Sequence, residues 1–402
     1  MRPNGSLASY SGRGMTADFR SNGQIRKLHT PTMDITRGPR GQRVIVSHLP
    51  DHRIIVCTGR RTGYVERPVF ARGHALIERT YVANNHTFTR VYDIYHFHGL
   101  EFQHYVPTFH YDPHFYGWAF YPWPRPIAFA WPWWGAAWLS FYGPYFALSP
   151  QYPGAPYWLT DYMMASTLQN AYDAQLQAPG DGDAPSADVT QNDGSSDEAY
   201  APAPTPITPD LKASIAEGVR QQLAYESAAV TQPDQEPTLT DLPQVLQPNR
   251  MFIVDNPVNA VTDDDVSCSL SGGDVLRLLS RPDEGAVAAD LTVASGNQYD
   301  CPAGARLSLP LQDLEEMQNN FRAQIDAGLK ILHDGQGRNG LPAAPPSAIG
   351  PPPRPSEYGA AAADANAGAL LDQAQQQAAA AERQAEQDAF APSVGSQTGP
   401  NN

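Results

Sequence analysis

Five histidines between residues 96 and 114 are the side chains whose type and spacing come nearest to a site for chemistry: His96, His98, His104, His110 and His114. On a strand, side chains two residues apart point to the same face. His96 and His98 would then share a face, as two imidazole ligands of a zinc or copper ion do. No cysteine or group of carboxylates beside them completes a ligand set. Two interpretations stay open: a metal ion held by His96, His98 and His104, or an ordinary β surface rich in His, Tyr and Phe.

Covalent and acid–base catalysis have no comparable candidates. A nucleophilic site needs a Ser or Cys next to a base, and general acid–base chemistry needs a positioned His or a pair of carboxylates. No such context is recognisable in the sequence. We therefore predict a protein that is not an enzyme and that carries no cofactor apart from the metal ion considered above.

An uncharged aromatic segment, residues 126–160, follows the histidines. It holds five tryptophans and six prolines and has no Asp, Glu, Lys, Arg or His. A membrane-spanning helix needs about 20 residues without helix breakers, whereas the longest proline-free stretch, Trp133 to Gly143, has 11 residues. We therefore predict no transmembrane helix. We expect an interaction surface built from six tryptophans of this region: Trp118, Trp123, Trp131, Trp133, Trp134 and Trp138.

The elements that must position these residues are short strands. From residue 17 to residue 111, runs rich in Val, Ile, Thr, Tyr and Phe alternate with turn signals rich in Gly, Asn and Pro, which predicts an antiparallel meander of hairpins. Large aromatic residues fall on both faces, so we expect residues 115–146 to fold back and cover the sheet. A helix that Thr160 opens as its N-cap is expected to end this module, which spans residues 17–177.

The second half of the chain alternates between tethers and small ordered pieces. Stretches rich in Pro, Gly, Ser, Ala and Gln predict disorder. Short strand-like runs, followed by an apolar helical seam from Leu311 to Leu332, predict a small SH3-like β-barrel with a C-terminal helix. The other segments expected are a disordered N-terminus at 1–16, a linker at 178–206, a helix at 207–228, a second linker at 229–249, the SH3-like domain at 250–333 and a disordered tail at 334–402. The expected fold class is mainly β with α.

The cysteines bear on the compartment. Cys268 and Cys301 fall in the small C-terminal domain, where a disulfide would stabilise a small core and would favour an oxidising compartment. Two buried free thiols are the alternative. The first residues, MRPNGSLASYSGRGM, lack the apolar core of a secretory signal, which by itself favours the cytoplasm. An upstream start codon would reconcile the two signals.

Six short motifs stand in order along the chain: GYVERP at 63–68, ERTY at 78–81, RVY at 90–92, FYGW at 115–118, PW at 122–123 and WLTDYM at 158–163. This succession resembles an uncharacterised family of exported bacterial proteins, and the resemblance covers residues 15–335. It implies a protein of the envelope or the medium, hence a periplasmic or extracellular location. It implies no activity, ligand or catalytic residue.

Charge is distributed unevenly, because residues 1–125 carry a net charge of +8 and the remainder −23. The two halves should attract each other or opposite partners. The arginines are spread along the chain one or two at a time and form no Lys/Arg block, so we expect no nucleic-acid partner. We expect a non-enzymatic envelope or secreted scaffold that binds a protein or an envelope surface, or that associates with itself. The alternative is a ligand-binding module for a metal ion at His96–His114, or for a peptide or cell-wall glycan on the barrel.

Overall fold

The computed structural model describes residues 8–20, 23–37, 43–59, 62–71, 73–83, 86–97, 99–177, 204–231, 246, 249–264, 266–283, 285–296, 301–348, 350–356 and 362–390. The chain divides into two compact units. Unit 1 comprises Met1–Arg67, Thr80–Phe88 and Ala363–Asn402, and unit 2 comprises Pro68–Arg79 and Thr89–Ala362. The predicted mixture of β and α structure is confirmed, with a long antiparallel meander and a smaller sheet.

Ten strands form the long sheet and follow one another in chain order. They are β1 Ser9–Gly12, β2 Met15–Phe19, β3 Ile25–Thr30, β4 Met33–Arg37, β5 Arg43–His48, β6 Ile54–Gly59, β7 Thr62–Ala71, β8 His74–Ala83, β9 His86–Phe97 and β10 Leu100–Val106. Strands β1 to β7 pair antiparallel in succession, as does β9 with β10. At the β1–β2 turn, Arg13 and Gly14 have φ angles of 51° and 77°, as a two-residue type I′ hairpin requires.

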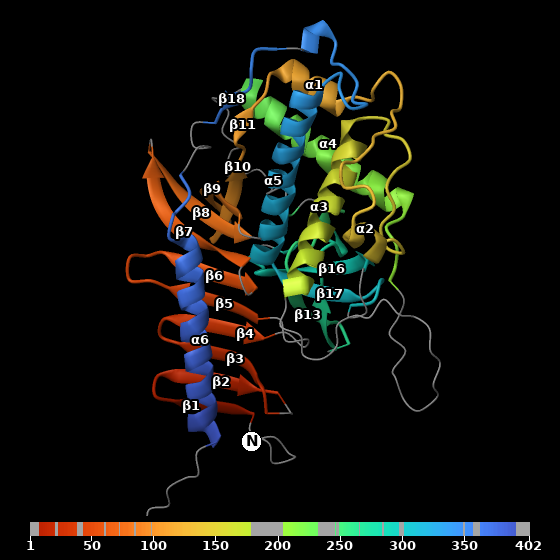
Figure 1. The fold of residues 1–402 in the computed structure, drawn as a ribbon. Helices are drawn as coiled ribbons and strands as arrows, with labels where there is room; N and C mark the ends of the chain where they lie inside the picture. Colours follow the sequence, from red (N-terminus) through yellow and green to blue (C-terminus); the bar gives the residue numbers. More distant parts are fainter. Residues whose placement is uncertain are drawn as a thin grey trace, which may run out of the picture. The chain divides into compact units, whose positions relative to one another are not determined.

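In unit 1, the alternation of side chains gives the sheet one buried face. Successive strands place small and apolar residues opposite one another in a row across the sheet: Ala17, Leu28, Ile35, Ile45, Cys57 and Gly63. The first five are at most 2 % exposed. Helix α6, Ala367–Phe390, lies across this face (Figure 1). It buries its own row there: Ala367, Leu371, Ala374, Ala378 and Ala385.

The docking of α6 differs from the disordered tail that the composition of residues 334–402 predicts. The helix approaches the sheet backbone so closely that a Cβ on Gly63 would collide with Leu371. Glu382 accepts hydrogen bonds from Arg37 Nε at 2.9 Å and from Arg43 Nη2 at 2.7 Å. Alanine-rich helices have few large apolar side chains, but their small ones permit many close contacts, and charge-assisted hydrogen bonds add to them.

Unit 2 holds a second sheet and five α-helices among its described residues. The strands are β12 Met251–Ile253, β13 Val258–Thr262, β14 Ser267–Leu270, β15 Val275–Leu278, β16 Ala288–Ser295 and β17 Arg306–Pro310. The helices are α1 Pro113–Phe120, α2 Ala137–Phe141, α3 Ala155–Gln177, α4 Pro209–Thr231 and α5 Leu311–Gly335. Strand β11 Phe109–His110 pairs with β18 Arg354–Pro355, and a 3₁₀ turn spans Pro346–Ala348.

The six strands β12 to β17 form an open sheet, in the order β12-β15-β16-β17-β13-β14. The edge strands β12 and β14 do not pair with each other over the described residues, so the expected SH3-like barrel is not confirmed. Cys268 and Cys301 form a disulfide between β14 and the segment before β17. Leu311, Leu314 and Met317 of α5 pack into the core of the sheet. The sheet therefore obtains its core from the helix and not from barrel closure.

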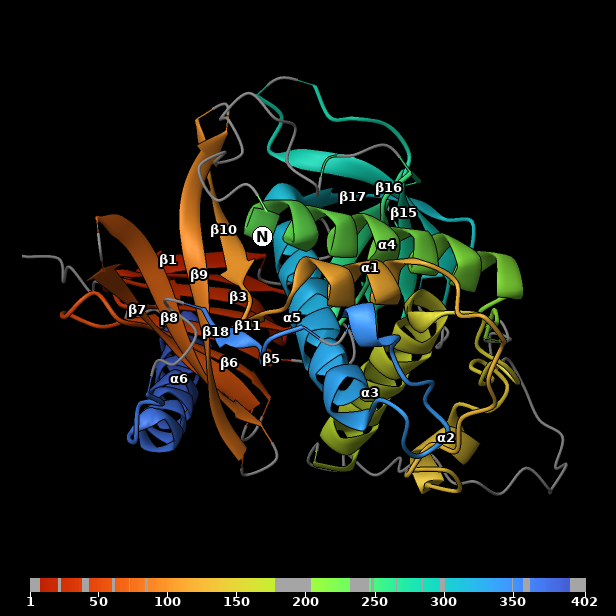
Figure 2. The ribbon, with the colours of Figure 1, turned by 90° about the horizontal axis from the view of Figure 1, so that it is seen from above.

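The uncharged aromatic segment forms a core of unit 2, and most of it is unavailable as the expected interaction surface. Of the six tryptophans, Trp123, Trp131 and Trp138 are buried. Trp118 and Trp133 are partly buried, and Trp134 is exposed. The ring of Trp131 stacks on those of Trp133 and Trp158, with centroids 4.8 Å apart in both pairs. These rings pack with residues of α1, α3, α4 and α5, which lie together (Figure 2). Residues 115–146 thus cover helices and not the meander.

A buried ion pair fastens this segment to α3 and α4. Asp161 is fully buried, and Lys212 Nζ donates to its Oδ1 at 2.6 Å and to the Ala147 carbonyl at 2.5 Å. The other carboxylate oxygen accepts from the Ser149 N–H at 2.6 Å and from the Tyr152 hydroxyl at 2.9 Å. Both charges therefore have the hydrogen bonds that burial demands.

Helix α3 begins before the expected N-cap. Its first residue is Ala155, and Pro156 follows in the first turn, where the missing N–H costs nothing. The Thr160 hydroxyl donates to the Pro156 carbonyl at 2.8 Å, as Ser and Thr do inside helices. The additional turn includes Trp158, which is 1 % exposed.

Candidate functional site

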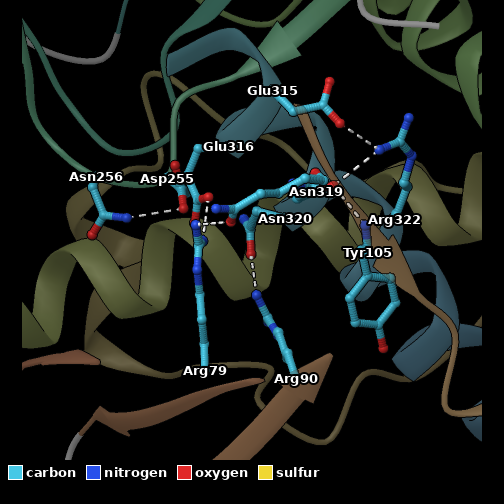
Figure 3. Close-up of polar contacts among 11 residues, drawn as sticks. Arg79, Arg90, Tyr105, Asp255, Asn256, Glu315, Glu316, Asn319, Asn320 and Arg322 are labelled. Carbon is cyan, nitrogen blue, oxygen red and sulfur yellow. Dashed lines mark hydrogen bonds and ion pairs between the residues drawn. The ribbon is translucent and has the colours of Figure 1, made fainter. Parts of the chain in front are cut away.

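Helix α5 carries two buried stripes. One is the predicted apolar seam, and its side chains are all buried: Leu311, Leu314, Met317, Phe321, Ile325, Leu329 and Leu332. The other is polar. Glu315, Asn319, Arg322 and Asp326 follow one another at helical spacing and are 1 to 5 % exposed. This second stripe lies against strand β10 and the residues around it (Figure 3).

The polar stripe closes the outer edge of β10. An edge strand turns the N–H and C=O groups of every second residue outward. The Asn319 amide satisfies two such groups, since its Oδ1 accepts from the Tyr105 N–H at 2.9 Å and its Nδ2 donates to the Gln103 carbonyl. Farther along, Asp326 Oδ2 accepts from the Thr108 N–H at 2.9 Å and from the Tyr105 hydroxyl at 2.8 Å. Side chains of α5 thereby make the hydrogen bonds that a neighbouring strand would otherwise make.

A buried ion pair holds Asn319 in place. Arg322 Nη1 donates to Glu315 Oε1 at 3.0 Å and to Asn319 Oδ1 at 2.9 Å. Burial raises the pKa of Glu315, and the Arg322 charge opposes that shift. Arg250 Nε donates to Gln318 Oε1 at 2.9 Å, and burial together with the Arg322 charge lowers the pKa of Arg250 to about 9. Such a group of charges fixes a geometry, because removing one member leaves another buried and unpaired.

Two further arginines connect β8 and β9 to the same helix (Figure 3). Arg79 donates to Glu316 Oε2 and to Gln103 Oε1, both at 2.5 Å. Arg90 Nη1 donates to Asn320 Oδ1 at 3.3 Å. Charge-assisted hydrogen bonds of this kind are stronger than neutral ones. The stripe on α5 and its neighbours therefore hold the end of the long sheet within unit 2.

Two carboxyl groups of this region have a pKa raised toward neutrality. Glu226 of α4 is 4 % exposed, and burial raises its pKa to about 7, against a hydrogen bond from Gln222 at 3.0 Å. Burial and the nearby Glu316 charge raise the pKa of Asp255 to about 7 as well. A raised pKa is a mark of catalytic acids, yet a general acid must reach its substrate. The burial of Glu226 denies it that contact and favours a structural role.

A hollow of about 310 Å³ lies between the start of α4 and the strands β15 and β16 of unit 2. It is lined by Thr208, Asp210, Leu211, Ser214, Arg277, Thr292, Val293 and Ala294. Thr208 directly precedes α4, and its Oγ1 accepts from the Leu211 N–H at 3.2 Å, as an N-cap residue does. Glu226 and Asp255 are not among the lining residues, so the hollow and these two carboxyl groups do not form one site.

Two of the three candidate metal ligands, His96 and His104, lie on the neighbouring strands β9 and β10. On β9 and β10, His96 is paired with Glu101, and His104 is paired with Asp93. Positions 93 and 96 fall on opposite faces of β9, because side chains alternate along a strand. His96 and His104 therefore point to opposite faces of the sheet. His98 lies outside the described residues.

His104 and His114 make local contacts within unit 2. The His104 ring packs against Tyr95 and Tyr225, and burial lowers its pKa well below the usual range, with the Arg322 charge adding to the shift. His114 Nδ1 lies 2.8 Å from Asp112 Oδ1 at the start of α1. Over the described parts of the chain, no three His, Cys, Asp or Glu side chains gather in a group that could hold a metal ion.

The second face of the sheet in unit 1 remains partly open. Its residues form another transverse row: Ser11, Thr16, His29, Asp34, Val46, Val56 and Tyr64. The row is polar on β1 to β4 and apolar on β5 to β7. Val46, Val56 and Tyr64 are each half-buried, whereas their neighbours in sequence on the α6 side are buried. We call this surface the open face. Its polar half lies on β1 to β4 and its apolar half on β5 to β7.

Comparison with protein-family models, curated proteins and solved structures finds no match for this chain. Among the helices in the described ranges, none is both long enough and apolar enough to cross a membrane. The geometry of the two units is therefore the basis for assigning a function.

Proposed function

We propose that the protein is a non-enzymatic scaffold of the cell envelope or the extracellular space, and that it binds a protein or an envelope surface through the open face. The observation that carries the proposal is the two-faced sheet of unit 1. Helix α6 covers one apolar row, whereas Val46, Val56 and Tyr64 on the other face are only half-buried. Contiguous apolar residues on a partly exposed sheet face are typical of surfaces that a partner covers.

The buried charges of unit 2 support a scaffold more than an enzyme. Glu315 and Arg322 are paired with each other, and Asp161 is paired with Lys212. Each pair connects segments that are distant in sequence through further hydrogen bonds. Such networks specify one arrangement of the chain and keep its elements rigid. Fixed packing of this kind, with the charged groups paired inside the unit, is suited to a scaffold.

The compartment in this proposal is supported by the disulfide between Cys268 and Cys301. Disulfides persist in oxidising compartments and are rare in the cytosol. The ordered motifs from GYVERP to WLTDYM add the resemblance to exported bacterial proteins. Both features favour the periplasm or the medium as the place where the open face meets its partner.

Cosedimentation of the full chain with the envelope fraction of the producing cells tests the proposal. Val46→Lys combined with Val56→Lys places two charges in the apolar half of the open face and should lower the bound fraction about tenfold. The control is Thr16→Lys combined with Thr36→Lys. Thr36 lies on the same face of β4 as Asp34, so this pair adds the same charge to the polar half and should leave binding unchanged. Equal binding by both pairs and the unaltered chain would contradict the proposal, provided that circular dichroism shows all three chains folded.

A further inference from the structure

Strand β1 has an open outer edge in the part of the chain that the structure describes. It pairs with β2 on one side. The Phe19 N–H donates to the Ala8 carbonyl, which sets the phase of the antiparallel ladder. Tyr10 therefore turns its backbone groups toward β2, and Ser9 and Ser11 turn theirs away. Among the described residues, nothing pairs with these outward N–H and C=O groups.

The two edge strands of the long sheet differ in this respect. On β10, Asn319 occupies the outward N–H of Tyr105 and the outward carbonyl of Gln103, and Asp326 accepts from the Thr108 N–H just beyond the strand. Proteins usually protect a free edge by keeping the strand short, or with charge, proline, a bulge or a covering element, and β1 has only the first of these, with 4 residues. The sequence of β1, Ser-Tyr-Ser-Gly, contains no charge and no proline. Strand β1 is therefore suited to pairing with a further strand.

An exposed aromatic side chain lies beside this edge. Phe390 is the last residue of α6 and is 55 % exposed, although its ring contacts that of Phe19 with centroids 5.5 Å apart. Tyr10 of β1 packs against the same cluster. A large apolar side chain next to unpaired backbone groups makes an edge that gains from being covered.

Charge at this edge is balanced. Arg13 Nη1 lies 3.0 Å from Asp388 Oδ1, and the Arg13 side chain is 69 % exposed. A surface that carries one cation and one carboxylate is complementary to itself under a two-fold axis, because the cation of each copy can face the carboxylate of the other. A second copy of the chain therefore meets no net repulsion here.

We propose that two copies of this chain pair antiparallel through β1 about a two-fold axis and extend the sheet of unit 1 across both. In the register that sets Tyr10 opposite its copy, Ser9 and Ser11 of one chain exchange about four hydrogen bonds with Ser11 and Ser9 of the other. The axis is perpendicular to the sheet, so both α6 helices lie on the same face and their Phe390 ends meet. This inference goes beyond the proposed function, since the edge and the open face are different surfaces.

Sedimentation velocity of the full chain over a concentration series tests the pairing. Ser11→Pro removes the outward N–H and leaves the bonds to β2, and proline is tolerated at such edge positions. The substitution should raise the dissociation constant of the dimer by about tenfold or more. Ser11→Thr keeps the N–H and should dimerise like the unaltered chain. Phe390→Ser, which does not touch the strand, should also weaken the dimer.

Hydrogen exchange of the unaltered chain checks the same pairing without a substitution. The Ser9 and Ser11 amides should exchange more slowly as the protein concentration rises. A chain that is monomeric at every concentration, or a dimer that Ser11→Pro leaves intact, would overturn the proposal. A dimer that is lost with Val46→Lys plus Val56→Lys, but kept with Ser11→Pro, would overturn it too and would place the contact on the open face.

Discussion

Replacing Glu226 by glutamine should stabilise unit 2 at alkaline pH and leave it almost unchanged in acid. The side chain is 4 % exposed, and burial raises its pKa from 4.5 to about 7. Glutamine keeps the shape of the side chain and a hydrogen bond to Gln222, but it cannot ionise. A shift of about 2.5 pKa units at about 1.4 kcal/mol each amounts to about 3 to 4 kcal/mol.

The direction of this pH dependence depends on whether the folded or the unfolded chain holds the Glu226 proton more tightly. The unfolded chain loses the Glu226 proton near pH 4.5, whereas the folded chain keeps it to about pH 7. Between these values the folded state binds more protons, so the stability of the unaltered chain falls as the pH rises. The Glu226→Gln variant cannot ionise at this position, so its stability does not fall in this way. Its advantage should therefore grow from about zero at pH 4.5 to about 3–4 kcal/mol at pH 8.

Urea unfolding followed by tryptophan fluorescence measures this difference. All seven tryptophans lie between residues 118 and 158 and hence in unit 2. The free energy of unfolding comes from linear extrapolation at pH 5 and at pH 8. Glu217→Gln on the exposed side of α4 is the matched control and should show no pH-dependent difference. A Glu226→Gln variant whose stability differs from the unaltered chain by the same amount at both pH values would refute the reasoning.

Three further outcomes are expected. Asp161→Ala should destabilise unit 2 by about 3–5 kcal/mol, because Lys212 would stay buried without its counter-ion; urea unfolding measures the loss, and adding Lys212→Met should recover part of it. Asn319→Asp keeps one hydrogen bond to β10 and loses the other, which should cost about 1–3 kcal/mol in the same assay, whereas Asn320→Asp keeps its acceptor oxygen and should cost little. Cys57 is 1 % exposed, and burial raises its pKa to about 12, so it should react slowly with a thiol reagent until α6 is deleted; equal rates with and without the helix would contradict the docking of α6.

The features that follow from local chemistry could be predicted. Alternating strand runs and turn residues indicate the meander, since hairpins depend on neighbours in sequence. The N-cap Thr208 and the apolar stripe of α4 are local signals too, and its side chains Leu211, Ile215, Val219 and Leu223 are buried. The apolar seam of α5 is a signal of the same kind.

The polar stripe of α5 could not be predicted from its spacing alone. Opposite an apolar seam, Glu315, Asn319, Arg322 and Asp326 have the pattern of a solvated face. Their partner is the edge of β10, more than 200 residues upstream in the sequence. One signal in the sequence is the spacing of an acid, an amide and an arginine at steps of four and three residues. On a helix these side chains can bond one another, and the amide can also bond the backbone of a strand.

The tryptophans and α6 show two further effects of tertiary packing. An irregular segment that enters a core must lack charge, so the same composition suits an interaction surface and a buried lining. Packing against the three long helices α3, α4 and α5 places most of this segment in the core of unit 2. Among the six tryptophans of the expected surface, Trp134 is exposed. In α6, Leu371 approaches the sheet closely because position 63 is a glycine, and the sequence of α6 alone does not reveal this requirement.

Site-specific photo-crosslinking from the open face tests the central claim most directly. A photoreactive amino acid at Val56 of the full chain, in the producing cells, should form a covalent adduct with a partner. The same amino acid at Gln377, an exposed position of α6, should form none. Adducts from Val56 that disappear with Val46→Lys would agree with binding at the open face. Equal adducts from Val56 and Gln377, or none from Val56, would contradict it.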